Sequence, residues 1–143
     1  MYKKILVPLE NGWADATILQ HARDLAQLTG ASITLLHVAD GFAARNYEQL
    51  ELVESEEIKK DRAYLHKIAM DLKTSGFSVE TMLAKGDPAS QIIRVAQEKQ
   101  IDCIAMATHG HRFFADVLFG TTATKVRHRV DIPVLFVKAK KAS

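Results

Sequence analysis

Short aliphatic runs recur along this chain and are separated by segments with helical periodicity. The runs occupy residues 5–7, 32–38, 77–84, 103–107 and 134–137, and only the third shows partial polar alternation. Strands that are apolar on both faces are typical of a parallel sheet covered by helices on both sides. The runs therefore predict five buried strands, the first of them ended by Pro8.

The intervening segments predict four helices. Apolar residues at helical spacing span residues 18–29 before Gly30, and residues 47–73 form one long charged helix. Asp87 and Pro88 open a third helix that ends near Lys99, and a fourth runs from residues 120–122 to Val130. The alternation predicts an α/β fold, a five-stranded parallel sheet with right-handed crossovers. Since the chain has 143 residues and no linker or repeat, we expect one domain over residues 1–143.

Composition narrows the classes of partner. Lys plus Arg exceeds Asp plus Glu only by 19 to 17, too small a surplus for wrapping a nucleic acid. The apolar run at residues 5–9 is too short for a signal peptide or a bilayer span, so no membrane insertion is expected. A lone Cys103 in an apolar run predicts a buried thiol, a reducing compartment and thus a cytoplasmic protein.

The stretch from residue 107 to residue 122 is the strongest candidate for a binding site. Ligands of such sheets bind beyond the carboxyl ends of the strands, and this stretch follows the fourth strand. Gly110 and Gly120 allow backbone N–H groups to approach a phosphate, and the helix start at Thr121 and Thr122 attracts an anion. An ordinary turn with a helix cap is the alternative. The stretch is neither a Walker loop nor a dinucleotide fingerprint, because the required Lys and glycine spacing are missing.

Six segments together resemble the universal stress protein family over essentially the whole chain. They are residues 5–10 (ILVPLE), 35–38 (LLHV), 86–88 (GDP), 108–110 (THG), 120–122 (GTT) and 133–137 (PVLFV). The resemblance implies a Rossmann-like three-layer sandwich of the adenine nucleotide alpha hydrolase-like type. It also implies a cytoplasmic, homodimeric stress-response sensor or regulator that binds ATP or AMP, with magnesium as a candidate companion of the phosphates and a regulatory protein as a candidate partner.

The family's ATP-binding loop reads Gly, two residues, Gly, nine residues, Gly, then Ser or Thr. Gly110, the nine residues 111–119, Gly120 and Thr121 fit this pattern, but Ala107 replaces the first glycine. Glu10 stands where the family usually has Asp, near the ribose, and Val38 corresponds to the position whose backbone reads the adenine edge. The resemblance thus assigns nucleotide contacts to Pro8, Leu9, Glu10, Val38, Ala107, Gly110, His111, Arg112, Gly120, Thr121 and Thr122, with no catalytic or metal-ligating residue.

The resemblance further implies a dimer in which the last strand pairs with its mate through Val134, Leu135, Phe136 and Val137. Two rival functions stay open. One is a family member that has lost nucleotide binding and acts through dimerisation and partner contacts. The other is a slow ATP hydrolase, for which Glu10, His109 and His111 are weak candidates for a general base. His109 and His111 have no compact ligand set around them that favours zinc.

Overall fold

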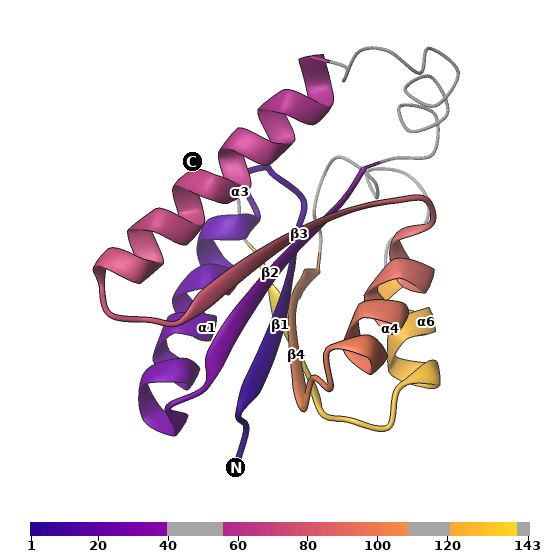
Figure 1. Ribbon diagram of the computed structural model, residues 1–143. Helices are drawn as coiled ribbons and strands as arrows, with labels where there is room; N and C mark the ends of the chain where they lie inside the picture. The colour runs from indigo at the N-terminus through magenta and orange to yellow at the C-terminus, as the bar shows by residue number, and fades with distance from the viewer. Residues whose placement is uncertain (40–55, 109–120, 140–143) are drawn as a thin grey trace.

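The computed structural model describes residues 1–39, 56–108 and 121–139. In chain order the elements are β1 (Lys4–Leu9), α1 (Asp15–Thr29), β2 (Ser32–Ala39), α3 (Glu56–Thr74), β3 (Val79–Lys85), α4 (Pro88–Glu98), β4 (Cys103–Thr108), α6 (Thr121–Arg129) and β5 (Val134–Lys138). The sheet has the order β3-β2-β1-β4-β5, and every neighbouring pair is parallel. The predicted five-stranded parallel α/β fold is confirmed (Figure 1).

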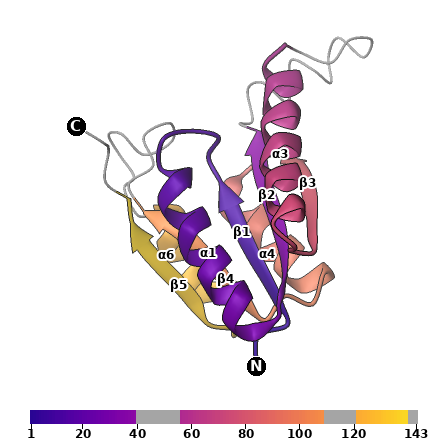
Figure 2. The same cartoon turned by 90° about the vertical axis from the view of Figure 1, so that its left-hand side faces the viewer.

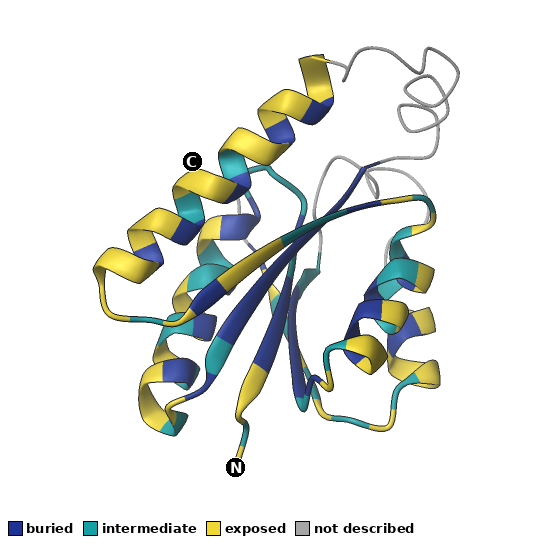
Figure 3. Ribbon diagram, in the orientation of Figure 1, coloured by how far each residue is buried: buried dark blue, intermediate teal, exposed yellow. Residues whose placement is uncertain are grey.

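Helices cover both faces of the sheet, α1 and α3 on one side and α4 and α6 on the other (Figures 1 and 2). Alternate residues of β1 and β2 divide the core between these faces. Ile5, Val7 and Leu35 pack toward α1 and α3, whereas Leu6 and Leu36 pack toward α4 and α6. Figure 3 shows β1, β2 and β4 largely buried between helices whose outer faces are exposed. The edge strands β3 and β5 are partly exposed, so the prediction of buried strands holds for the three inner strands only. Burying both faces of the inner strands explains why their sequences lack polar alternation.

The start of β3 differs from the sequence prediction. Phe77 and Ser78 precede β3, because the Phe77 N–H still donates to Leu72 O at the end of α3, beside Gly76 with φ 98°. The part of the predicted long helix before residue 56 lies outside the described residues. Cys103 is buried, as expected. No described helix is both long and apolar enough to cross a membrane.

Pro8 does not end β1, contrary to the sequence prediction. It pairs in register with Leu36 of β2, and the strand continues to Leu9. Lys3 O accepts from Ser32 N on the β2 side and Lys4 O accepts from Asp102 N on the β4 side, so the even residues of β1 face β4. The N–H that Pro8 lacks is therefore on the β4 side, and the β1–β4 register covers only Ile5 and Leu6. β1 and β4 separate at the point where the strand order reverses.

Candidate functional site

A pocket of about 660 Å³, partly open to solvent, lies at the carboxyl ends of β1 and β4. Its walls come from the ends of three strands and the first turns of three helices. The lining residues are Pro8, Leu9, Glu10, Asp15, Leu36, Val38, Pro88, Ile92, Met106, Ala107, Thr108, Thr122 and Ala123. The pocket occupies the separation that Pro8 leaves between β1 and β4, where ligands of open parallel sheets bind.

The pocket walls are mostly apolar. Leu36 and Ile92 are almost fully buried there, and Met106 and Val38 are each 6% exposed. The polar side chains in the lining are those of Glu10, Asp15, Thr108 and Thr122. A flat apolar ring with a few polar substituents matches such a lining, because the apolar walls supply area and the polar groups set orientation.

Two helices begin at this pocket. α4 starts at Pro88, and its cap, Asp87, accepts from Ser90 N at 2.9 Å and from Ser90 Oγ at 2.7 Å. These two hydrogen bonds, ahead of the more distant charges of Lys125 and Arg129, lower the pKa of the Asp87 carboxyl. α6 starts at Thr121, with Thr122 in the pocket wall. The positive end of the α6 dipole at this wall favours an anion, whereas the start of α4 is already capped by the Asp87 carboxylate.

Asp15 fixes the loop between β1 and α1 from the α1 side. Its Oδ1 accepts from Glu10 N at 2.9 Å, and its Oδ2 accepts from Gly12 N at 3.2 Å and from the Tyr64 hydroxyl at 2.9 Å. Burial raises the pKa of Asp15, against the effect of these hydrogen bonds. Burial also raises the pKa of Tyr64, and the Asp15 charge adds to the shift. Because its oxygens already accept these bonds, Asp15 holds the loop that carries Glu10.

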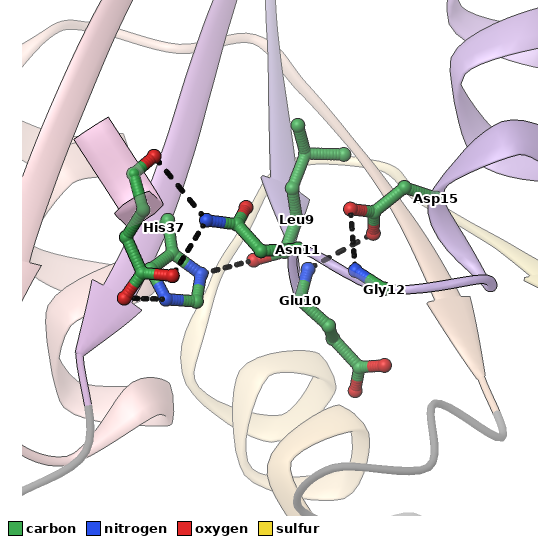
Figure 4. A network of polar contacts seen from close by, with 7 residues as sticks. Leu9, Glu10, Asn11, Gly12, Asp15 and His37 are labelled. Atoms are coloured by element: carbon green, nitrogen blue, oxygen red, sulfur yellow. Dashed lines mark hydrogen bonds and ion pairs between the residues drawn. The ribbon is translucent and has the colours of Figure 1, made fainter. Parts of the chain in front are cut away.

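A second buried network holds the same loop from the side of β2 and α3. Asn11 Nδ2 donates to Asp61 Oδ1 at 3.0 Å and to Asp61 O at 3.3 Å. His37 Nε2 lies 3.2 Å from Asp61 Oδ2, and its Nδ1 lies 2.9 Å from Leu9 O. Figure 4 shows this network, with the Glu10 side chain directed away from it. Asn11 itself has φ 60°, a left-handed conformation that few residue types besides glycine and asparagine adopt readily.

The structure brings six of the predicted site residues to one pocket: Pro8, Leu9, Glu10, Val38, Ala107 and Thr122. Gly110, His111, Arg112 and Gly120 lie outside the described residues, as does His109, and of Thr121 only the helical position is described. Within the described ranges, no group of three or more His, Cys, Asp or Glu side chains could hold a metal ion.

Sequence reasoning missed the residues that support the pocket. Asp15, Tyr64 and Asp61 come from two helices, and His37 comes from a buried strand. One signal was available, since a histidine inside the apolar run of β2 has to find polar partners. Its partners could not be identified, because Leu9 and Asp61 are far from His37 in sequence.

A sequence model described as the universal stress protein family matches residues 1–138 of the chain. A curated relative, universal stress protein MJ0577 of Methanocaldococcus jannaschii, is 28% identical, with 98% of this chain and 97% of the relative covered. A solved structure of MJ0577 has a TM-score of 0.83 and covers 99% of both chains.

Two more distant solved structures share the fold. A universal stress protein from Archaeoglobus fulgidus in complex with dAMP is 20% identical, with a TM-score of 0.70 and coverage of 96% of this chain and 98% of that one. A universal stress protein in complex with cAMP is 18% identical, with a TM-score of 0.69 and coverage of 97% and 98%. At these identities the likeness concerns the fold alone.

Proposed function

The chain belongs to the universal stress protein family, and from this premise we propose that it binds an adenine nucleotide, ATP or AMP, in the pocket between β1 and β4. The observation that carries the proposal is the composition of the pocket, with apolar walls, the Glu10 carboxylate and the start of α6. An adenine ring suits the apolar walls, ribose hydroxyls suit the Glu10 carboxylate, and phosphates suit the start of α6. The complexes of two family members with dAMP and cAMP support the same ligand class.

Each wall of the pocket has a role in this proposal. The adenine lies against Val38 and Met106, and the ribose hydroxyls donate to Glu10. The phosphates lie toward Thr122 and the start of α6, with Ala107 below them and with the predicted contacts Gly110, His111, Arg112, Gly120 and Thr121 beyond the described part of this wall. Magnesium enters as a companion of the phosphates.

Calorimetric titration with ATP, AMP and dAMP tests the nucleotide proposal. Glu10→Ala should weaken ATP binding by about 10- to 150-fold, the equivalent of a lost hydrogen bond to a charged group. Glu10→Asp, which restores the residue usual in the family, should keep most of the affinity. Glu56→Ala is the matched control, because that carboxylate is exposed at the start of α3. Repeating the ATP titration in EDTA measures how much magnesium contributes to the affinity for ATP. A parent chain that binds none of the three nucleotides would refute the proposal.

We also propose that the cytoplasmic, regulatory form of the chain is a homodimer paired through β5. This strand is an edge of the sheet, and its Leu135 is 38% exposed. Pairing β5 with that of a second copy would cover the unpaired backbone groups and this side chain. Leu135→Lys should place a charge at this edge and give monomers in sedimentation velocity. Leu28→Lys, at an exposed apolar residue of α1 away from β5, should leave the dimer intact. A folded Leu135→Lys variant that stays fully dimeric would refute this arrangement.

A further inference from the structure

His37 has a hydrogen-bond acceptor at each ring nitrogen. Nδ1 lies 2.9 Å from the carbonyl oxygen of Leu9, and Nε2 lies 3.2 Å from Asp61 Oδ2. A carbonyl oxygen only accepts, so Nδ1 carries a hydrogen, and a neutral imidazole then has a bare Nε2. A bare nitrogen would repel an ionised carboxylate oxygen at this distance. The geometry is therefore satisfied when one further proton lies between Nε2 and Oδ2.

The proton between His37 and Asp61 is important for the loop because both side chains are buried. His37 is 2% exposed and Asp61 is 6% exposed, so water cannot replace a lost hydrogen bond between them at low cost. Asp61 also accepts from Asn11 through Oδ1 and through its backbone oxygen. The pair thus connects β2 and α3 to the residue that follows Glu10.

We propose that His37 and Asp61 share one buried proton and act, through Asn11, as positioning residues for the nucleotide pocket. The proposal rests on the proposed function of that pocket. Neither His37 nor Asp61 is part of the pocket lining, whereas Glu10 and Leu9 are. The pair acts on the ligand only by holding the loop between β1 and α1 in place.

Among the residues that the structure describes, the titratable groups near the pair come from several elements. The loop contributes Glu10, and Asp15 of α1 binds Tyr64 of α3, one turn from Asp61. β3 places the apolar Leu83 beside His37, with Lys85 two residues further along the strand. Raising the pH removes the shared proton, so His37 and Asp61 repel each other and the hold on Asn11 weakens. Nucleotide affinity then falls as pH rises through the titration of the pair.

Asp61→Asn removes the need for the shared proton but can keep the hydrogen bonds. An asparagine can accept from Asn11 through Oδ1 and donate from Nδ2 to a neutral Nε2, so all contacts persist without the extra proton. The variant should bind ATP at low pH with the affinity of the parent, and its affinity should not follow the parent's loss at higher pH. Comparing two proteins with the same ligand cancels the ionisation of ATP itself. Asp71→Asn, an exposed aspartate on the same helix, should keep the pH dependence of the parent.

Asn11→Gly tests the link to the loop, because glycine adopts the φ of 60° without strain. It removes the donor to Asp61, and nucleotide affinity should fall about tenfold, the equivalent of one lost hydrogen bond to a charged group. An Asn11→Gly variant with the affinity of the parent, or an Asp61→Asn variant with an unchanged pH profile, would overturn the positioning role.

Nuclear magnetic resonance of the ligand-free parent chain tests whether the shared proton is present, without any nucleotide. The ¹⁵N shifts of His37 and the ¹³C shift of the Asp61 carboxyl should report one proton beyond the Nδ1 hydrogen near neutral pH, and Asp61→Asn should show a neutral ring protonated at Nδ1. A neutral ring beside an ionised Asp61 would overturn the proposal, even where Asp61→Asn fails to fold. If the spectra show the proton and the parent binds no nucleotide, the proposed function fails and the positioning role fails with it, while the proton assignment stands.

Discussion

The two faces of the sheet are built differently. The face under α4 and α6 is mainly aliphatic, and Leu6, Leu36 and Ile104 are completely buried there, with Thr34 as a buried polar residue. The face under α1 and α3 has a similar aliphatic core but also buries Asp15, His37 and Asp61 near the carboxyl ends of the strands. The pocket is lined mainly from the aliphatic face. One face thus supplies most of the pocket lining, and the other fixes the loop at its rim.

Asp15→Asn should give the largest change in stability. The replacement keeps the shape, but its NH₂ group would face a backbone or hydroxyl donor that the carboxylate now accepts from, so at least one buried donor is unsatisfied. We expect a loss of about 4 kcal/mol in the free energy of unfolding, measured in urea. Asp24→Asn, on the exposed side of α1, is the matched control. A loss below about 1 kcal/mol would mean that the α1 and α3 face is held by packing alone.

Leu36→Ala tests the opposite face. The side chain is completely buried under the pocket, so its truncation should cost about 3 kcal/mol through lost burial and a cavity. Leu36→Met, which conserves volume, should cost less than about 1.5 kcal/mol. The comparison between the faces fails if Leu36→Met lowers the free energy of unfolding in urea as much as the isosteric Asp15→Asn does.

Asp87→Ala should give the smallest effect, because this carboxylate is exposed and acts only on the first turn of α4. Loss of the cap should cost about 1 kcal/mol at neutral pH. The pKa of Asp87 is lowered in the folded state, so the stabilisation is present above the ordinary value of 3.8 and disappears as the pH falls through the lowered one. Parent and Asp87→Ala should converge in acid, whereas Asp87→Asn should match the parent near neutral pH and become the more stable of the two in acid, because its cap does not titrate. A difference that grows in acid would contradict the assignment of the cap.

Local patterns were sufficient for the fold. Aliphatic runs and helix caps such as Gly30, with φ 75°, and Asp87 identified every described element. Their ends were predicted within three residues, except for the predicted start of the long helix, which lies outside the described residues. Pro8 was misread because a proline usually interrupts a central strand, and only the pairing on both sides shows that its missing N–H falls where β1 and β4 separate.

The pocket was predictable in part for a similar reason. Glu10 follows β1, Ala107 lies near the end of β4, and Thr122 lies near the start of α6. These ends meet at one edge of the sheet. Asp61 is different, because it lies within a charged helix and has nothing in its neighbourhood that distinguishes it from the exposed Asp71. Its partners Asn11 and His37 come from distant parts of the chain, so only the packing of α3 on β2 reveals its role.

Pro8 has a mechanical consequence. The register of β1 with β2 runs from Lys4 to Leu9, whereas its register with β4 covers only Ile5 and Leu6. The sheet therefore has two parts, β3-β2-β1 and β4-β5, which pair with each other near the amino ends of β1 and β4 and separate toward their carboxyl ends. We expect a ligand in the pocket to contact both parts of the sheet and to restrict their relative twisting. Amide exchange in β4, compared with and without a nucleotide, would measure that loss of flexibility.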